Sequence, residues 1–227
     1  MPPCRIVSCP GLTPYPDALA WQQALAARRG RGELSDTLLL LEHPPTITLG
    51  RGTDEADLLA SGADLAARGI AVERVDRGGE VSYHGPGQLV GYPILDLRQH
   101  GQDLHRYLRD LEEVLIVSLR AFGLDGTRVP GRTGVWVGDA KIAAIGIKVS
   151  RWVSLHGWAL NVTTDLTPFR RDFVPCGIRD RGVTSLAERL GAACPTRAEV
   201  EAVLIEAFAA VFSVQPMTDG EMGILLP

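Results

Sequence analysis

Residues 134–162 read GVWVGDAKIAAIGIKVSRWVSLHGWALNV, and this stretch decides the class of fold. It holds three strand candidates in succession, at 134–139, 141–150 and 153–162, with no helix between them. Further strand-like segments precede it at residues 38–43, 46–50, 70–76, 80–85 and 88–97. Because these strands do not alternate regularly with helices, the sequence predicts an α/β protein of the α+β type, with a mixed or antiparallel sheet flanked by helices.

Helical patterns surround this group of strands. One helix is expected over residues 15–29, and two short helical pieces are expected between residues 55 and 68. The strongest pattern covers residues 103–123, where apolar side chains recur every three or four positions. These side chains are Leu104, Leu108, Leu111, Leu115, Leu119 and Phe122. Ser185-x-x-Glu188 and Thr196-x-x-Glu199 are capping-box signatures, so each is expected to open a further helix.

The bulk composition excludes several classes of protein. The formal net charge is −4 over 227 residues, so we expect no nucleic-acid partner. No apolar run approaches the length of a membrane span, and the N-terminal MPPCRIVSCPG lacks the basic and apolar regions of a signal peptide. We therefore expect a cytoplasmic protein that binds no membrane. Because no linker divides the chain, we also expect a single domain over residues 1–227.

One of the four cysteines has an unusual setting. Cys176 lies in a loop between a proline and a glycine, whereas Cys4 and Cys9 flank a strand-like stretch and Cys194 precedes a helix. The cysteines show no C-x-x-C spacing and no nearby histidine pair, so we expect no zinc site. A reducing cytosol disfavours a disulfide framework. By elimination, Cys176 alone has a setting that differs from that of a buried structural cysteine.

Residues 76–93, DRGGEVSYHGPGQLVGYP, combine five glycines with interleaved polar side chains. The glycines by themselves are compatible with two tight hairpins. The polar side chains Arg77, Tyr83, His84 and Gln88 favour a loop that lines a ligand, because glycine allows the backbone to approach closely. The stretch carries neither of the two common glycine-rich nucleotide-binding patterns, so it does not indicate a nucleotide site.

The strand candidate at 141–150 contains two lysines that a regular alternation separates. Lys148 is expected to point to solvent. Lys141 is expected on the face formed by Ala143, Ile145, Ile147 and Val149. At the mouth of this apolar face, Lys141 either extends its amine from the strand end into water or acts as a base, because desolvation lowers the pKa of an amine.

The histidines differ in their surroundings. His156 lies in a strand candidate, where a single histidine is more often a hydrogen-bonded core residue than a catalyst. His84 lies among glycines, so a core position and a ligand-lining position are both open. His43, His100 and His105 carry no functional indication.

Several of these motifs together form a specific pattern. RGGEVSYHGPGQLVGYPI, KIAAIG, SLHGWALNV and FVPCGI follow one another in order, with LLLLEHPPTITLGR before them and GVTSL after them. In order and spacing they closely resemble the lipoyl (octanoyl) transferases of lipoate synthesis, over about residues 36–190. Ser82 stands where the family often has Thr, and Ile47 where an aromatic is common. The resemblance implies the fold of biotin and lipoate protein ligases, a mixed sheet flanked by helices.

The resemblance also implies the chemistry. Cys176 and Lys141 would form a Cys/Lys pair beside an acyl pocket. The implied pocket residues are Arg77, Gly78, Gly79, Glu80, Val81, Ser82, Tyr83, His84, Ala144, Ile145, Gly146, Gly157, Trp158 and Ala159. The implied reaction moves an octanoyl group from octanoyl-acyl carrier protein to a specific lysine of a lipoyl domain, through a thioester on Cys176. This is the first step of endogenous lipoate biosynthesis.

Partners and cofactors follow from the same resemblance. The acceptors would be the lipoyl domains of 2-oxoacid dehydrogenase complexes and the glycine cleavage H protein. Conversion of a thioester into an amide runs downhill, so we expect no ATP, no other cofactor and no metal. We expect the protein to act as a monomer.

Other functions remain open from the residues. An ATP-dependent lipoate or biotin protein ligase would share the fold and use a lysine, but it would have no need of Cys176. A cysteine hydrolase would pair Cys176 with His84 or His156, and a carrier-protein-binding module would hold a structural cysteine. The arginines near Cys176 form either a solvated loop balanced by aspartates or a docking patch for an acidic carrier. These arginines are Arg170, Arg171, Arg179 and Arg181.

Overall fold

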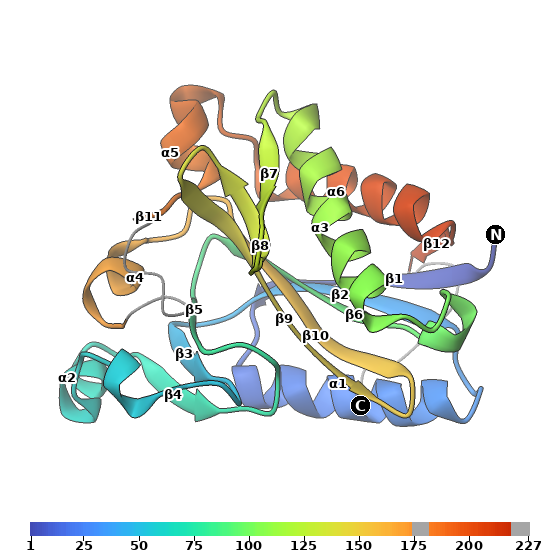
Figure 1. Ribbon diagram of the computed structural model, residues 1–227, viewed down its shortest axis with the longest axis horizontal. Helices are drawn as coiled ribbons and strands as arrows, with labels where there is room; N and C mark the ends of the chain where they lie inside the picture. Colours follow the sequence, from blue (N-terminus) through green and yellow to red (C-terminus); the bar gives the residue numbers. More distant parts are fainter. Residues whose placement is uncertain (174–181, 219–227) are drawn as a thin grey trace.

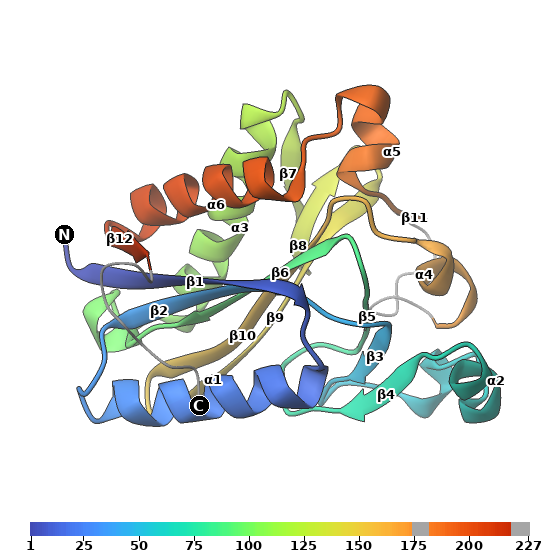
Figure 2. The same ribbon diagram turned by 180° about the vertical axis from the view of Figure 1, so that it is seen from behind.

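The computed structural model describes residues 1–173 and 182–218, which form two β-sheets with helices packed around them (Figures 1 and 2). Within these residues the larger sheet has nine strands in the order β12-β1-β2-β6-β10-β9-β8-β7, with β11 beside β9, and the smaller sheet has the order β4-β3-β5. The strands are β1 (Pro3–Leu12), β2 (Asp36–Glu42), β3 (Thr46–Leu49), β4 (Ala71–Arg74), β5 (Val81–His84), β6 (Gln88–Ile94), β7 (Gly126–Val129), β8 (Arg132–Val137), β9 (Ala140–Ser150), β10 (Val153–Asn161), β11 (Gly182–Val183) and β12 (Gln215–Thr218). The α-helices are α1 (Tyr15–Gly30), α2 (Gly62–Ala67), α3 (Leu104–Ala121), α4 (Thr167–Arg171), α5 (Leu186–Leu190) and α6 (Arg197–Phe212). Short 3₁₀ turns are η1 (Glu55–Asp57), η2 (Leu97–Gln99) and η4 (Gly191–Ala193).

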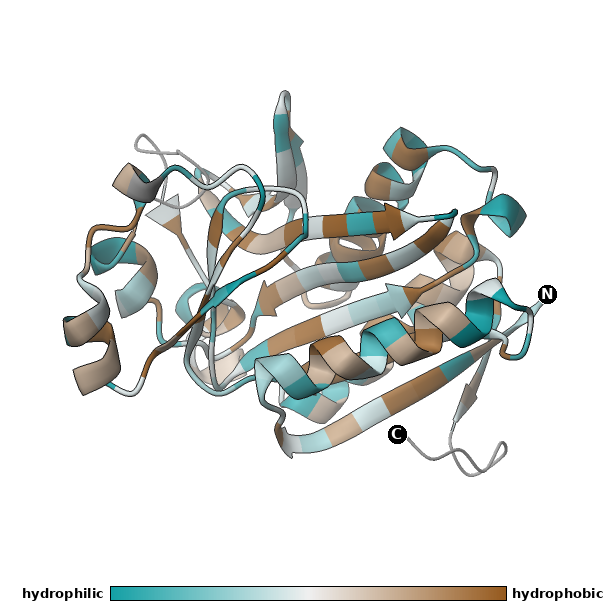
Figure 3. Cartoon of the chain, turned by 90° about the horizontal axis from the view of Figure 1, so that it is seen from below, coloured by the Kyte–Doolittle hydropathy of each residue, from teal (hydrophilic) through white to brown (hydrophobic). Residues whose placement is uncertain are grey.

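The large sheet is mixed and is flanked by helices, which confirms the predicted fold class. β1 pairs in parallel with β12 and with β2, whereas the pairs β2–β6, β6–β10, β10–β9 and β9–β8 are antiparallel. Helices α3 and α6 cover one face of this sheet, and α1 covers the other (Figures 1 and 2). Figure 3, seen from the side of α1, shows apolar bands of the strands running beneath that helix.

The run of four leucines at 38–41 shows how one strand serves both faces. Successive side chains of a strand point to opposite faces. Leu38 and Leu40 therefore enter the core under α3 and α6, whereas Leu39 and Leu41 enter the core under α1. All four side chains are fully buried. A strand covered on both faces reads as a continuous apolar run rather than an alternating one.

The predicted helices form, with local differences at their ends. The Asp103 carboxylate caps α3 by accepting hydrogen bonds from two backbone N–H groups of its first turn. Leu104 is 42% exposed, so the apolar stripe of α3 reaches the core only after its first turn. Thr196 and Glu199 form the full reciprocal capping box of α6. Ser185 caps α5, but the Glu188 carboxylate turns to other partners instead of closing the box.

The smaller sheet stands beside the large one and carries β5 toward β9 and β10 (Figure 1). Its own core contains Ile47 and Val81 together with Phe169 of α4 and Phe173. Phe173 also forms an isolated β-bridge with Leu58, which ties the segment after α4 to this small sheet. Among the described residues, no helix is both long enough and apolar enough to cross a membrane.

Candidate functional site

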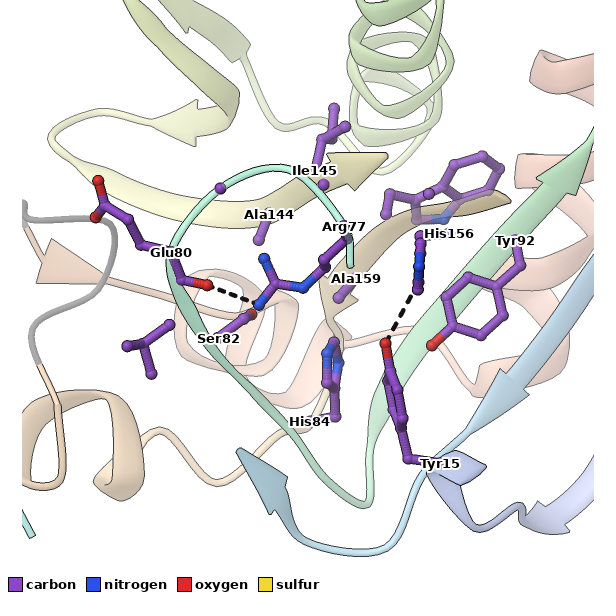
Figure 4. Close-up of a pocket in the computed structure, with 15 residues that line it drawn as sticks. Tyr15, Arg77, Glu80, Ser82, His84, Tyr92, Ala144, Ile145, His156 and Ala159 are labelled. Atoms are coloured by element: carbon purple, nitrogen blue, oxygen red, sulfur yellow. Dashed lines mark hydrogen bonds between the residues drawn. The ribbon is translucent and has the colours of Figure 1, made fainter. Parts of the chain in front are cut away.

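A pocket lies between the loop before β5, the strands β9 and β10, and the start of α1 (Figure 4). The pocket is partly open to solvent. Its polar and phenolic lining residues are Tyr15, Arg77, Glu80, Ser82, His84, Tyr92 and His156. Its other lining residues are Gly79, Val81, Ala144, Ile145, Gly146, Gly157, Trp158 and Ala159. One side of the pocket is therefore built of small and apolar residues, whereas a hydrogen-bonded cluster forms the opposite side.

Arg77 holds the loop before β5 in place, and its side chain is almost entirely buried. Its Nη2 donates to the Thr48 carbonyl (3.0 Å), to Thr48 Oγ1 (2.8 Å) and to the Glu80 carbonyl (2.8 Å). Its Nη1 donates to the Gly78 carbonyl (3.0 Å). A buried cation requires such partners to offset its lost hydration. Arg77 therefore fixes the backbone from residue 78 to residue 80 around the pocket.

Small residues on β9 and β10 leave room for the pocket. The loop meets β9 through a hydrogen bond from Gly78 N to the Ile147 carbonyl (2.8 Å). A Cβ on Gly146 would lie 2.8 Å from the Gly78 carbonyl oxygen, so only glycine permits this approach. Ala144 of β9 pairs directly with Ala159 of β10. Because the side chains of both alanines are single methyl groups, they leave space for the pocket beside the two strands.

A second pocket, of about 330 Å³, adjoins the first and contains Lys141. Phe169 and Val183 also line it. The residues that line both pockets are Val81, Ser82, Ala144 and Ala159. The two pockets are therefore adjacent, with these small side chains between them. Lys141 lies at one end of the pair, and the hydrogen-bonded cluster lies at the other.

Lys141 occupies a buried position with defined partners. It is 7% exposed, and its Nζ donates to the Thr133 carbonyl at 3.3 Å. The Nζ also lies 4.8 Å from the ring centre of Trp136, within the range of a cation–π contact. The fully buried Glu112 carboxylate accepts a hydrogen bond from Gly134 N at 3.2 Å and so fixes the backbone next to Thr133. These contacts hold the Lys141 side chain in place at the wall of the second pocket.

A β-bulge in β9 changes the expected position of Lys141. β8 pairs with Lys141 and with Ala143 at consecutive positions, which leaves Ile142 as an extra residue. Ile142 and Ala143 consequently both enter the main core, and Lys141 lines a pocket together with Ala144. The regular alternation predicted for this strand is therefore wrong at its start. Lys148, beyond the bulge, is ion-paired and 33% exposed, close to the expected solvated position.

A chain of hydrogen bonds holds the side chain of His84 in the wall of the pocket. Thr48 Oγ1 lies 3.4 Å from His84 Nε2, and His84 Nδ1 lies 2.8 Å from Gln88 Oε1. Gln88 Nε2 donates to Asn161 Oδ1 (2.9 Å), and Asn161 Nδ2 donates to the Thr184 carbonyl (3.0 Å). Because Gln88 Nε2 is a donor here, Gln88 Oε1 accepts, so His84 carries its proton on Nδ1 and accepts at Nε2. The imidazole is thus neutral and fixed in orientation.

The end of the first pocket away from Lys141 is a cluster of rings. His156 Nδ1 lies 3.4 Å from the Tyr15 hydroxyl (Figure 4). His156 Nε2 lies 3.3 Å from Asp76 Oδ1. His43 Nε2 lies 2.7 Å from the Tyr92 hydroxyl, while its Nδ1 donates to a backbone carbonyl at 2.7 Å. Both imidazoles therefore have a partner at each nitrogen.

Burial keeps these histidines uncharged near neutral pH. Desolvation lowers the pKa of His43 and of His156 to about 4. It also lowers the pKa of His84 well below the ordinary value, and the positive charge of Arg77 acts in the same direction. A protonated histidine in this cluster would lose its hydration without gaining a carboxylate partner. His156 is the exception, because the Asp76 carboxylate opposes the lowering of its pKa.

We expect the free energy of unfolding to fall as the pH drops from about 6.5 to about 4. In this window the unfolded chain binds protons that the folded histidines do not bind, so acid favours unfolding. The loss should be on the order of 3 kcal/mol for each such histidine. Urea unfolding on either side of the window measures it. His43→Asn should flatten the dependence, whereas replacement of the exposed His105 by Asn should not change it. A free energy of unfolding that stays constant across the window would contradict neutral buried histidines.

The structure brings most of the sequence-predicted pocket residues together. All of them except Gly78 and Tyr83 line the first pocket. Gly78 instead lines a third, more open pocket that also includes Lys141. Tyr83 points into the small core, where its ring lies 5.5 Å from that of Phe169. Cys176 lies outside the described residues.

The arginines near Cys176 can be placed only in part. Arg170 is ion-paired with Glu188 at 2.8 Å. Arg171 lies between Asp172 and Asp64, at 3.1 and 3.6 Å. These ion pairs agree with the solvated, charge-balanced alternative for Arg170 and Arg171. Arg179 and Arg181 lie outside the described residues.

Sequence reasoning missed several residues of the site. Tyr15 lies outside the motifs. Asp76 and Tyr92 lie in the glycine-rich stretch 76–93 but were not singled out there, and His43 had no functional indication. A signal for His43 does exist in the sequence, because it lies two positions after the buried run of leucines and directly before two prolines. His156 is a hydrogen-bonded core residue, as predicted, and it also lines the pocket.

Comparisons of this chain with a family model, with relatives and with solved structures all lead to the same group of proteins. The model of the lipoyl protein ligase A/B catalytic domain matches residues 14–209. An octanoyltransferase of Chloroflexus aurantiacus is 58% identical over 205 residues, covering 88% of this chain and 91% of its own. An octanoyltransferase of a Synechococcus species is 51% identical over 226 residues, covering 94% and 84%. The crystal structure of a lipoate-protein ligase A bound with ATP superposes with a TM-score of 0.77 at 21% identity, covering 96% of this chain and 89% of that one. At that identity the likeness concerns the fold.

Proposed function

The chain belongs to the lipoyl protein ligase A/B catalytic domain family, and we propose that it is the octanoyltransferase of protein lipoylation. The observation that carries this proposal is the 51–58% identity to octanoyltransferases over most of both chains. The enzyme is thus an acyltransferase. The finer proposal is that it takes an octanoyl group from octanoyl-acyl carrier protein and places it on a lysine of a lipoyl domain. We further propose that residues 1–227 act as one catalytic domain and as a monomer.

The two adjacent pockets support an acyl substrate. We infer that the two pockets, which share these small lining residues, form one channel from Lys141 to the ring cluster when the substrate binds. An octanoyl chain that fills the channel removes about seven carbon groups from water, worth on the order of 5 kcal/mol. Arg77 and the buried histidines fix the channel walls before the substrate arrives, which limits the cost of ordering them on binding.

The proposed chemistry starts with a thiolate at Cys176 and an ammonium at Lys141. The Cys176 sulfur attacks the carbonyl carbon of the donor thioester, and the carrier thiolate leaves with a proton from Lys141. The acyl group then rests on Cys176 as a thioester. The amine of the acceptor lysine attacks this thioester, Lys141 accepts the proton that the amine loses, and Cys176 leaves as thiolate. The pair returns to its starting state without ATP.

The chain around Cys176 supports this assignment. The described chain resumes at Gly182, and β11 pairs Gly182 with Ala140 and Val183 with Lys141. Cys176 precedes Gly182 by six positions, a length of chain that spans at most about 20 Å. A segment of this length permits the Cys176 thiol to reach the Lys141 amine, as the proposed pair requires.

The experiment is a transfer assay with octanoyl-acyl carrier protein and a lipoyl domain, in the absence of ATP. We expect octanoylation of the lipoyl domain, and no reaction with free octanoate plus ATP. Formation of product only with octanoate and ATP would identify a ligase instead. Release of octanoate at the same rate with and without the lipoyl domain would identify a hydrolase.

A further inference from the structure

His156 has a backbone conformation that a strand residue rarely adopts. Its φ is +57°, in the left-handed region, although it lies in the middle of β10. Among the described residues, the other non-glycine residues with positive φ lie at turns or at a helix end. These residues are Gln102, Arg151, Trp152 and Ser213. Strain of this kind persists where the surrounding structure enforces it, and it concentrates at functional sites.

Contacts from two other elements hold His156 in this conformation. Its backbone N–H donates to Gln22 Oε1 of α1 at 2.7 Å, and Gln22 is itself fully buried. The imidazole lies between the Tyr15 hydroxyl, also on α1, and the Asp76 carboxylate. Asp76 accepts the proton of Nε2, so Nδ1 is left to accept from Tyr15. The side chain is 1% exposed, and both of its ring nitrogens have a partner.

The imidazole lies where an acyl tail would end. Tyr15, Tyr92 and His156 line the first pocket but not the second, which contains Lys141. All three are buried, and they form the wall of the first pocket on that side. Figure 4 shows them on the side of Arg77 away from Glu80, whereas Ala144 and Ser82 lie toward the middle. A chain whose carbonyl is near Lys141 therefore passes the alanines and meets the ring cluster with its methyl end.

We propose that His156 determines the longest acyl chain that the enzyme accepts, an inference that rests on the proposed octanoyl transfer. The strained backbone turns the imidazole across the end of the channel, and Tyr15 and Asp76 lock it there. Glycine adopts the same φ without strain, so removal of the imidazole opens the end wall and leaves the strand in place. Space gained there accommodates further methylene groups.

The test compares wild type with His156→Gly and His156→Asn on hexanoyl, octanoyl, decanoyl and dodecanoyl carrier proteins. The ratio of kcat/KM for decanoyl over octanoyl is expected to rise roughly tenfold in His156→Gly, since two buried methylenes are worth about that much. Asparagine tolerates the left-handed region and keeps a polar contact, so His156→Asn should give a smaller rise. Arg151→Gly relieves a positive φ of 49° in the exposed hairpin turn and should leave the ratio unchanged.

A second readout separates this inference from the proposed function. Binding of free octanoic and decanoic acid, measured by calorimetry, should show the same change in preference whether or not transfer occurs. If wild type transfers no acyl group, the proposed function is wrong. A change in fatty-acid binding preference in the His156 variants would still support the role of His156. An unchanged ratio and an unchanged binding preference in folded His156→Gly and His156→Asn would overturn the role of His156.

Discussion

Replacement of Cys176 by serine is expected to lower octanoyl transfer by roughly 10³-fold or more. The proposed reaction stores the acyl group on a sulfur, because exchange between two thioesters is close to even in free energy. A serine hydroxyl is a weak nucleophile near neutral pH, and Lys141 would have to remove a proton of much higher pKa from it. The variant should therefore show neither rapid transfer nor a covalent adduct. Steady-state transfer rates and intact-mass spectra measure both.

The other cysteines supply the controls for this variant. Cys4 is fully buried, and burial raises the pKa of its thiol, as it does for Cys194. Both thiols are therefore poor nucleophiles. Cys194 is a partly exposed residue that lines neither of the two pockets at the site. Cys194→Ser should keep the wild-type rate. Transfer at the wild-type rate by Cys176→Ser would remove Cys176 from the mechanism.

Replacement of Lys141 by methionine is expected to lower transfer by about 10²–10⁴-fold, the range typical for loss of a general acid–base group. Methionine has a similar length and can occupy the place next to Trp136, so the fold should survive. The variant loses the ammonium that stabilises the Cys176 thiolate and the base that receives the proton of the acceptor amine. The pKa of the Cys176 thiol should therefore rise. The pH dependence of alkylation, followed on the peptide that contains Cys176, measures this pKa.

Lys148 provides the matched control for Lys141. It lies on the same strand, and it is the only other lysine in the chain, but it is ion-paired and one-third exposed (33%). Lys148→Met should leave the alkylation profile of Cys176 close to that of wild type. If Cys176 of the Lys141→Met variant is alkylated with the same pH dependence as in wild type, the proposed thiolate–ammonium pair is wrong.

Most of the fold was predictable because its signals are local. The helix over 104–121 follows from a strict apolar period with an aspartate cap. The strands from residue 134 to residue 162 follow from three β-rich segments joined by tight turns. β7 and β12, by contrast, are four-residue edge strands whose residues are mostly exposed, so no apolar pattern marks them. β12 is defined by its parallel pairing with β1, a contact across almost the whole chain.

The bulge at Ile142 could not be predicted from the sequence. Alternation in KIAAIGIKVS assigns Lys141 to the face of Ala143, and nothing in these residues indicates an additional one. The bulge depends on the pairing with β8, because Trp136 pairs with Lys141 while its neighbour Val135 pairs with Ala143. This tertiary feature places Lys141 beside Ala144 and so brings the amine into the channel.

The pocket was predictable from motifs, but its closed end was not. Ala144, Gly146 and Ala159 belong to recognisable segments. Tyr15 reaches the pocket, and His43 reaches the ring cluster beside it, only through the packing of α1 and the end of β2 against the smaller sheet. Their roles depend on contacts between segments distant in sequence, which no single window contains.

The most direct test of the account is the intact mass of the wild-type protein after mixing with octanoyl-acyl carrier protein, without ATP and without a lipoyl domain. The account predicts a gain of one octanoyl group, located on Cys176 by peptide mapping and lost when the lipoyl domain is added. An unchanged mass in a preparation that transfers octanoyl groups once the lipoyl domain is added, or an octanoyl group carried on another residue, would contradict it.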